Sequence, residues 1–280
     1  SDLPALSAYT ALAFNWLRAS GQTIPAAVEM PLQAYLRNFL RQDVMPDFYS
    51  RGMSATVRAM ALAALAAHDK ISRADLERYQ PSMPEMSLFG KAHFLLAATH
   101  VADTKAIQDK VVAAIQAHGD ESTGTLVFSE ALDAAAQRIL ESSMRTNCAL
   151  LSALLAYEAR QGSEALGHDV PVKLVRTITQ NRKRAQRWEN TQENMFCMQA
   201  LLDFSRRYER DAPQMTLRAL FENVPMGAAT FQAFTDPAAE FHRPLQGGDA
   251  GRAAQLTLQR QGQGRFYYTT RLAYSPATLR

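Results

Sequence analysis

The character of the sequence changes once, at Asp211-Ala212-Pro213. Before this point the chain is rich in alanine, and its apolar residues recur three or four positions apart, which is the spacing of one helix face. After this point, short apolar runs alternate with prolines and glycines, as in a chain of strands and turns. The pattern predicts a mainly α protein, with a helical domain over residues 1–212 and a small β segment over residues 213–280.

Composition narrows the class of protein. Of the 280 residues, 47% are hydrophobic and 20% are charged, which is typical of a globular chain that buries a core. The formal net charge is +3, and so small a surplus does not indicate nucleic-acid binding. No apolar run approaches the roughly 18 residues of a membrane-spanning helix, so no direct membrane span is expected.

Several helices are marked by their ends. Asp2 can cap the first helix, Pro4 suits its first turn and Gly21 follows its end. A second helix is expected from about Met30, with Pro31 in its first turn. A short helix is expected from Ser72, where Ser72 and Asp75 can form a capping box. The other expected helices are 54–68, 86–101, 104–118, 142–161, 169–182 and 190–210.

Short strands are expected in two places. Residues 119–128 have the composition of a turn with a short strand. In the C-terminal segment the runs 230–234, 254–259 and 265–274 are expected to be strands, the last because it is rich in aromatic and β-branched residues.

Five of the expected helices open alike, with Ser or Thr followed by a segment rich in alanine or leucine. A hydroxyl in this position can cap a helix, and the openings recur at intervals compatible with the roughly 40–47-residue period of stacked helix pairs. We therefore expect helical hairpins, arranged as an open solenoid or closed into an α/α toroid, with an irregular helix bundle as the alternative. The openings are Ser7, Ser54, Ser87, Thr146 and Thr191.

The histidines do not suggest a metal site. His93 and His100 are seven residues apart and share a helix face, but no third ligand stands at metal-binding spacing and the H-E-x-x-H pattern is missing from the sequence. We expect structural or surface roles for all of them, with no metal and no cofactor. The full set is His68, His93, His100, His118, His168 and His242.

An enzyme is the main alternative to a binding protein. A closed ring of helix pairs is also a scaffold for enzymes that act on polysaccharides or isoprenoids, and cleavage of a glycoside needs two carboxylates that face each other. The sequence has neither the acidic and aromatic clusters of a sugar cleft nor a G-x-S-x-G or phosphate-loop motif, so an enzyme is not favoured. The candidate carboxylates are Glu85, Glu130, Glu193 and Asp203.

The two cysteines, Cys148 and Cys197, both lie in apolar helical runs. Such positions favour buried, unreactive thiols. A single disulfide between them stays open, because a pairing cannot be deduced from sequence.

The most informative segment is Trp188-Glu189-Asn190-Thr191-Gln192-Glu193-Asn194-Met195. It resembles the start of a late helix in the thioester-type domain of bacterial alpha-2-macroglobulin-like proteins, where W-x-x-T-Q-E-N precedes a helix that carries Ala-Leu, as Ala200-Leu201 does here. Three further stretches resemble the family in order and spacing. They are Tyr9 to Gly21 with Ile24-Pro25, Arg145-Thr146 ahead of Ala149-Leu150-Leu151, and Gly262-Gln263-Gly264-Arg265-Phe266-Tyr267-Tyr268.

The candidate site residues of this segment are Trp188, Thr191, Gln192, Glu193 and Asn194. The Thr191 hydroxyl can cap the helix, and Glu193 suits the positive end of the helix dipole. Trp188 can pack back onto the helix as a hydrophobic staple. We expect these residues to serve capping and packing, and the functional alternative is a polar cluster at the mouth of the toroid.

The resemblance implies a broad-spectrum protease inhibitor of the bacterial periplasm and not an enzyme. Such an inhibitor presents a bait segment, is cleaved there by the attacking protease and collapses around it. Its partners would be proteases and the other domains of the same protein, with no cofactor and no nucleic acid. The intact protein would be periplasmic, either free or anchored to the inner membrane.

In many members of the family, a Cys and a Gln side chain of a Cys-x-Glu-Gln motif form an internal thioester. Cys148 begins Cys-Ala-Leu-Leu and Cys197 begins Cys-Met-Gln-Ala, so this sequence lacks the motif and no reactive residue is carried over. The resemblance implies that residues 1–212 are the C-terminal part of the thioester-type domain, without its first helices, and that residues 213–280 belong to a CUB-like domain. A fragment of this kind is expected to have unpaired strand edges and an exposed apolar flank.

Overall fold

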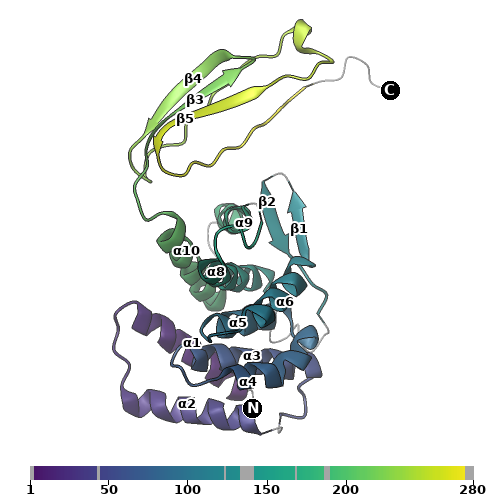
Figure 1. Cartoon of the computed structure of the whole chain (residues 1–280), viewed down its shortest axis with the longest axis vertical. Coiled ribbons are helices and arrows are strands. Elements are labelled where there is room, and N and C mark those ends of the chain that lie inside the picture. The colour runs from purple at the N-terminus through teal and green to yellow at the C-terminus, as the bar shows by residue number, and fades with distance from the viewer. Residues whose placement is uncertain are drawn as a thin grey trace. The chain divides into compact units, whose positions relative to one another are not determined.

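The computed structural model describes residues 3–42, 45–122, 124–132, 142–167, 169–185 and 190–274, with the backbone alone for 183–185. Contacts divide the chain into two compact units, Ser1–Phe204 and Ser205–Arg280. The first unit holds the helices and the second holds a small antiparallel sheet (Figure 1). The expected mainly α fold with a C-terminal β segment is confirmed. The identities of the two domains, thioester-type and CUB-like, stay predictions.

The helical unit consists of nine described α-helices and one 3-10 helix. Its elements are α1 (Leu3–Ala19), α2 (Ala26–Arg41), α3 (Arg51–Ala66), α4 (Arg73–Tyr79), the 3-10 helix η1 (Gln80–Glu85), α5 (Leu88–Thr99), α6 (Lys105–Gln116), α8 (Ser143–Gln161), α9 (Val170–Ala185) and α10 (Thr191–Tyr208).

The core of this unit runs along α1, α3, α5 and α8, each of which packs on the next (Figure 1). Within α5, every side chain except Leu96 is buried, and a helix that is buried all round must be flanked on several sides. The helices between them lie outside: α2 packs on α1 and α3, α6 on α5, and α9 on α8. This is the arrangement of helical hairpins, and its closure into a toroid stays a prediction.

Local capping explains where several helices begin. Ser87 caps α5, where its Oγ accepts a hydrogen bond of 3.1 Å from the backbone N–H of Gly90. Ser72 and Asp75 form the expected capping box of α4. Each of these short side chains satisfies a backbone donor that the first helical turn leaves free.

Three of the five expected helix openings are wrong. Ser7, Ser54 and Thr146 lie inside α1, α3 and α8, and the caps of the latter two are Ser50 and Ser142. A Ser or Thr before an alanine-rich run is compatible with a helix interior as well as with a cap, so each helix extends backwards until a better cap or a break stops it.

The expected start of α2 at Met30 is also wrong. The helix begins at Ala26, directly after Pro25, and Pro31 lies inside it. Pro25 is the N-cap of α2, and its carbonyl accepts hydrogen bonds from the backbone N–H groups of Val28 and Glu29, at 3.0 and 3.2 Å.

A β-hairpin interrupts the helices. β1 (Gly119–Ser122) pairs antiparallel with β2 (Thr125–Phe128), where a turn and a single short strand were expected. Leu126 and Phe128 of β2 are buried, and the Thr177 hydroxyl of α9 donates a 2.6 Å hydrogen bond to the Leu126 carbonyl. The hairpin is therefore fixed against α9.

The second unit is a three-stranded antiparallel sheet in the order β4-β3-β5. Its strands are β3 (Gln214–Phe221), β4 (Val224–Phe231) and β5 (Leu256–Gln263). The two residues between β3 and β4, Glu222 and Asn223, have φ values of 49° and 65°, as a tight hairpin turn requires.

Two of the strand expectations are wrong. The sequence analysis missed β3, and residues 265–274 are not a strand. The run Leu217–Leu220 contains Leu, Arg and Ala, which favour helices, yet it becomes the central strand because it pairs on both sides, with β4 and β5. Residues 265–274 have typical strand residues, but composition alone does not supply a pairing partner.

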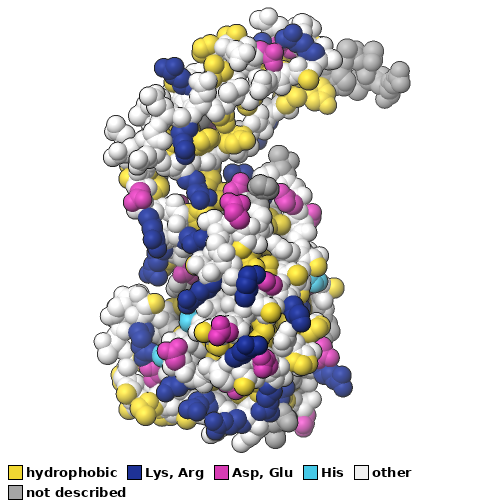
Figure 2. Space-filling model, viewed as in Figure 1, with side chains coloured by type: hydrophobic (Ala, Val, Ile, Leu, Met, Phe, Trp, Pro, Cys, Tyr) yellow, Lys and Arg dark blue, Asp and Glu magenta, His cyan; other side chains and the backbone are white. Residues whose placement is uncertain are grey.

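The sheet unit buries few side chains. Among residues 205–274, the buried ones are Pro213, Met215 and Ala219. Figure 2 shows hydrophobic side chains at the surface of this unit, in agreement with the expected exposed apolar flank. Within the described residues, the outer edges of β4 and β5 have no strand partner. The large exposed apolar residues are Val224, Phe234, Leu245, Leu256, Tyr267, Tyr268, Leu272 and Tyr274.

Candidate functional site

The described part of the segment singled out in the sequence, residues 190–195, contains the start of α10. Here the Asn190 side chain, and not Thr191, is the cap, because Asn190 Oδ1 accepts a 2.9 Å hydrogen bond from the backbone N–H of Glu193. Thr191 and Asn194 are exposed, whereas Glu193 is buried. The expectation that Thr191 caps the helix is therefore wrong by one position. Trp188 lies outside the described residues, so its stapling role stays a prediction.

Gln192 and Glu193 belong to a polar cluster that joins three helices. Arg145 of α8 donates through Nη1 to the Tyr9 hydroxyl of α1, at 2.8 Å, and to Gln192 Oε1 of α10. The Ser142 hydroxyl donates to Glu193 Oε1. We refer to Tyr9, Ser142, Arg145, Gln192 and Glu193 as the Arg145 cluster. It brings together residues from three of the four stretches that resemble the family.

The Arg145 cluster holds a charge inside the protein. Arg145 is only 2% exposed and Glu193 only 4%. Burial lowers the pKa of Arg145 below its ordinary value, while Tyr9 and Glu193 raise it. The guanidinium also lies over the ring of Phe89, with 4.5 Å between its central carbon and the ring centroid. A buried charge of this kind needs its partners, because a lone charge out of water is strongly destabilising.

The Arg145 cluster rests on an aromatic core. Phe196 of α10 meets the ring of Trp16 edge to face, with centroids 4.9 Å apart, and the ring of Phe89 at 5.1 Å. His93 lies 5.8 Å from Phe196 and its Nδ1–H donates to the Phe89 carbonyl at 2.8 Å. Burial lowers the pKa of His93 to about 4. His93 is therefore a neutral core residue at pH 7.

A disulfide joins Cys148 of α8 to Cys197 of α10. The expectation of two free, buried thiols is therefore wrong, although both residues are fully buried as expected. Their Cα atoms are 4.9 Å apart, so the two helices are in close contact at this point. The pairing joins positions 49 residues apart, and no local pattern in the sequence could have revealed it.

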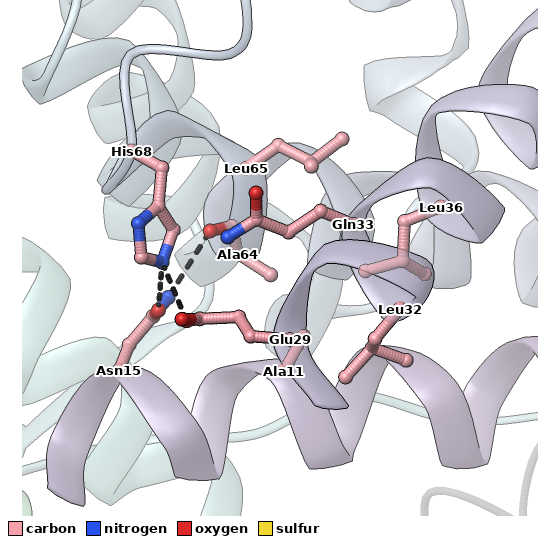
Figure 3. A pocket seen from close by; sticks show the side chains of 9 residues that line it. All are labelled: Ala11, Asn15, Glu29, Leu32, Gln33, Leu36, Ala64, Leu65 and His68. Atoms are coloured by element: carbon pink, nitrogen blue, oxygen red, sulfur yellow. Dashed lines mark hydrogen bonds and ion pairs between the residues drawn. The ribbon is translucent and has the colours of Figure 1, made fainter. Parts of the chain in front are cut away.

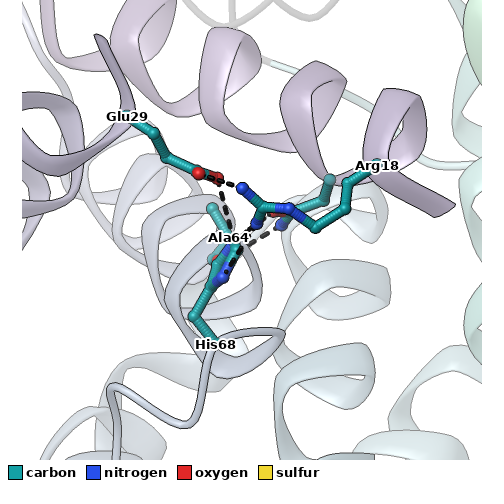
Figure 4. A network of polar contacts seen from close by, with 5 residues as sticks. Arg18, Glu29, Ala64 and His68 are labelled. Atoms are coloured by element: carbon teal, nitrogen blue, oxygen red, sulfur yellow. Dashed lines mark hydrogen bonds and ion pairs between the residues drawn. The ribbon is translucent and has the colours of Figure 1, made fainter. Parts of the chain in front are cut away.

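A second polar network lies between α1, α2 and α3 (Figure 4). His68 donates through Nε2 to Asn15 Oδ1 at 2.6 Å and accepts from Arg18 Nη1 at Nδ1, 3.2 Å away. Arg18 also forms an ion pair with Glu29, which lies 3.4 Å from His68. Asn15 Nδ2 donates to the Ala64 carbonyl at 3.1 Å.

Three of these polar residues, Asn15, Glu29 and His68, line a small pocket. Apolar residues that include Leu32, Leu36 and Leu65 complete its lining (Figure 3). Its volume is about 10 Å³, which is room for about one water molecule and not for an organic ligand. Burial lowers the pKa of His68, with Glu29 acting in the opposite direction. The network therefore ties three helices together and does not form a ligand site.

The other histidines have separate surroundings. His100 and His118 contact the backbone carbonyls of Leu96 and Ser129, at 3.0 and 3.2 Å. His242 is exposed beside Glu240, and His168 lies outside the described residues. Within the described part of the chain, no three His, Cys, Asp or Glu side chains gather as metal ligands would.

The four candidate carboxylates have different partners. Glu130 accepts the backbone N–H of Leu88 at the start of α5, at 2.8 Å, and burial raises its pKa. Glu85 lies 3.8 Å from the exposed Arg51, and Asp203 accepts from Gln199 of its own helix at 2.9 Å. Glu193 belongs to the Arg145 cluster. These contacts place two of the carboxylates at helix starts and give no support to a facing catalytic pair.

The chain thus has a helical-hairpin unit, which contains the Arg145 cluster, followed by a small antiparallel sheet. Solved bacterial alpha-2-macroglobulins contain a region with a similar fold. The chain is similar to Salmonella alpha-2-macroglobulin reacted with methylamine, with 17% identity and a TM-score of 0.57 over 82% of this chain. It is similar to native E. coli alpha-2-macroglobulin, with 17% identity and a TM-score of 0.57 over 93% of this chain, and to the same protein activated by porcine elastase, with 17% identity and a TM-score of 0.56 over 91%.

The resemblance to bacterial alpha-2-macroglobulins is thus confirmed at the level of the fold. The chain spans only 14% of the Salmonella and native E. coli chains, and 20% of the elastase-activated one. No family model matches the chain, and no curated protein matches it. Among the helices that the structure describes, none is long and apolar enough to cross a membrane.

Proposed function

We propose that this chain is part of a bacterial alpha-2-macroglobulin-like protease inhibitor. In this proposal the helical unit belongs to the thioester-type domain, arranged as an α/α toroid, and the sheet unit to the CUB-like domain. The intact inhibitor is cleaved in its bait segment by the attacking protease and then closes around it. The chain itself is a structural part of the trap and not an enzyme.

The observation that carries this proposal is the extent of the fold likeness. It covers up to 93% of the chain, which requires both the helical and the sheet unit in the same chain order. The E. coli protein is described as activated by porcine elastase, which supports a protease as the partner. The Arg145 cluster adds support, because it gives a common structural role to stretches that resemble the family in sequence.

The disulfide limits what the chain contributes to the trap. Cys148 and Cys197, the only cysteines of the chain, are bonded to each other, so neither offers a thiolate for an internal thioester. We infer that any thioester of the intact protein uses a cysteine outside this chain. The disulfide also supports the periplasm as the location, because disulfides persist in oxidising compartments.

Trapping can be tested with the intact protein and porcine elastase. A trapped protease keeps its active site free, so elastase should keep its activity on a small chromogenic peptide and lose activity on a large protein substrate. Equal inhibition on both substrates, or none on the large one, would contradict the proposal.

The 280-residue chain alone is the control. It should leave elastase activity on both substrates unchanged, because it supplies no complete trap. Methylamine should add no mass to it, since both cysteines are in the disulfide. Inhibition by the chain alone would point to a directly binding inhibitor instead.

A further inference from the structure

Helix α10 connects the two units of the chain. It runs from Thr191 to Tyr208, and the boundary between the units falls inside it, after Phe204. One face of α10 is buried through Phe196, Cys197, Ala200 and Phe204. The opposite face carries an exposed apolar stripe of Met195, Met198 and Leu202, which are 37%, 49% and 46% exposed. This exposed stripe therefore contributes little to holding α10 in place.

Successive ties hold α10 to α8. Going along α8, Ser142 bonds to Glu193, Arg145 bonds to Gln192, and Cys148 is joined to Cys197. The first two contacts are hydrogen bonds of the Arg145 cluster, and the third is the disulfide bond. Because Arg145 and Cys148 are three residues apart, they lie one turn from each other on the same face of α8. The disulfide therefore fixes the register in which Arg145 meets α10.

The disulfide is closed to solvent in this arrangement. Both cysteines have an exposed fraction of 0%, and Phe196, the residue before Cys197, is also buried. A reductant must contact a sulfur atom along the disulfide axis to react. It can do so only when a local motion of α10 briefly exposes the bond, which is still intact at that moment.

We propose that the Cys148–Cys197 disulfide is a redox-sensitive lock on α10. A dithiol reductant attacks one sulfur as a thiolate, forms a mixed disulfide and releases the other cysteine as a thiol. Its second thiol then resolves the mixed disulfide, so the protein gains two thiols and the reductant becomes an intramolecular disulfide. After reduction, α10 opens from α8 as a unit while α3 and α5 stay folded.

The charge of Arg145 makes the opened state distinct. With α10 docked, Arg145 has Gln192 and Glu193 close by and is almost without water. When α10 opens, the guanidinium becomes hydrated at the former contact with α10. The lock thus controls both the attachment of the helix that leads to the sheet unit and the exposure of a buried charge. This inference does not depend on the proposed inhibitor function.

Hydrogen exchange on the whole 280-residue chain tests the proposal. The chain is compared in its oxidised form and after reduction by an excess of dithiothreitol. Reduction should speed exchange of the α10 amides about 30-fold to 1000-fold, the range that corresponds to typical disulfide stabilisation, and leave the amides of α3 and α5 nearly unchanged. Unchanged exchange in α10 would overturn the proposal, and so would equal acceleration throughout the helical unit.

Variants distinguish the effect of losing the disulfide from other effects of the reductant. The double variant Cys148→Ser/Cys197→Ser should reproduce the fast exchange of α10 without any reductant. Ala153→Ser introduces the same hydroxyl at another buried position of α8 and should leave exchange of α10 relative to α5 as in the parent chain. If the control accelerates α10 as much as the double variant does, the lock is refuted.

The rate of reduction gives a second measurement that does not require a variant to fold. If α10 must open first, the rate of thiol release should rise with dithiothreitol concentration and then reach a plateau set by the opening rate. A rate that stays proportional to dithiothreitol at all concentrations, with no change in α10 exchange, would show an accessible disulfide and overturn the proposal.

Discussion

The helical unit and the sheet unit hold themselves together in different ways. In the helical unit, α3 and α5 bury most of their side chains. One polar network joins α1, α8 and α10, and a second joins α1, α2 and α3. In the sheet unit, only Pro213, Met215 and Ala219 are buried among residues 205–274. Side-chain packing therefore carries the first unit, whereas backbone pairing carries the second.

Polar contacts supplement the ladder of the sheet unit. Asp249 accepts hydrogen bonds from the backbone of Gln246 and from Arg243, at 2.8 and 2.9 Å. The guanidinium of Arg243 also lies 3.9 Å from the ring centroid of Phe221. Such contacts order a loop but bury little apolar area, and a unit of this size needs apolar burial to be stable alone. The stability of the helical unit should therefore depend mainly on its buried side chains, and that of the sheet unit mainly on its backbone hydrogen bonds.

The strongest test of this difference is to truncate one phenylalanine side chain in each unit and compare the losses of stability. Phe94 in α5 is 0% exposed, whereas Phe234 in the sheet unit is 54% exposed. We expect Phe94→Ala to lower the free energy of unfolding of the helical unit by about 3–5 kcal/mol, because it leaves a cavity. Phe234→Ala, the matched control, should change stability by no more than about 0.5 kcal/mol. Urea denaturation followed by circular dichroism measures both, and similar losses would contradict the comparison.

The next prediction concerns the charge buried in the helical unit. Arg145→Met should destabilise this unit by about 3 kcal/mol, because Glu193 would then be left as a buried charge without its counter-charge. Adding Glu193→Gln should recover part of the loss, which a double-mutant cycle measures. Arg206→Met, at an exposed position of α10, is the control and should have little effect. Full additivity of the two substitutions would argue against coupling in the Arg145 cluster.

A proline in the central strand tests whether backbone pairing carries the sheet unit. Thr216 of β3 pairs with Thr230 on one side and Gln261 on the other. We expect Thr216→Pro to destabilise the sheet by about 2–3 kcal/mol, because proline cannot donate to the ladder. Thr270→Pro, in a segment outside the strands, is the control. Amide exchange should rise in β3, β4 and β5 and stay unchanged in α5, and a rise in α5 would show that the units do not behave separately.

The smallest expected effect is a pH dependence that belongs to the helical unit. His93 has its pKa lowered to about 4 by burial, against about 6.5 in an unfolded chain. The unfolded state therefore binds the proton more readily, so stability is full above about pH 6.5 and falls as the pH drops towards 4. Between pH 7 and pH 5 we expect His93 to contribute a loss of about 2 kcal/mol.

Denaturation curves at the two pH values check this prediction. His93→Gln should flatten the dependence, because the substituted side chain does not titrate. His242→Gln, at an exposed position with 86% of its side chain accessible, should leave it as in the parent chain. An identical pH profile for all three proteins would contradict a neutral, buried His93.

Much of the helical unit could be predicted from the sequence. The helices around 86–101, 104–118 and 142–161 appear as α5, α6 and α8 within a few residues, and the capping box of Ser72 and Asp75 is present. These features depend on residues three or four positions apart, so the signal is local. The expected helix starts at Ser7, Ser54 and Thr146 are wrong because Ser and Thr occur both at N-caps and inside helices.

The candidate site could be predicted only in part. The segment 190–194 contains two residues of the Arg145 cluster, but nothing in the sequence placed Tyr9 or Ser142 beside them. Similarly, the strand residues of 265–274 remain unpaired in the described structure while Leu217–Leu220 becomes the central strand. A strand depends on its neighbours as much as on its own composition.

By itself, the sequence determined the order of a helical part and a β part, most helix positions, and the likeness to bacterial alpha-2-macroglobulins, since these depend on periodicity and on short ordered motifs. Only the tertiary structure decided the pairing of Cys148 with Cys197, the convergence of Tyr9, Arg145 and Glu193, and the choice of β3 as the central strand. The physical reason is distance along the chain. Each of these outcomes depends on contacts between residues that lie tens of positions apart, and their stability comes from being buried or paired together.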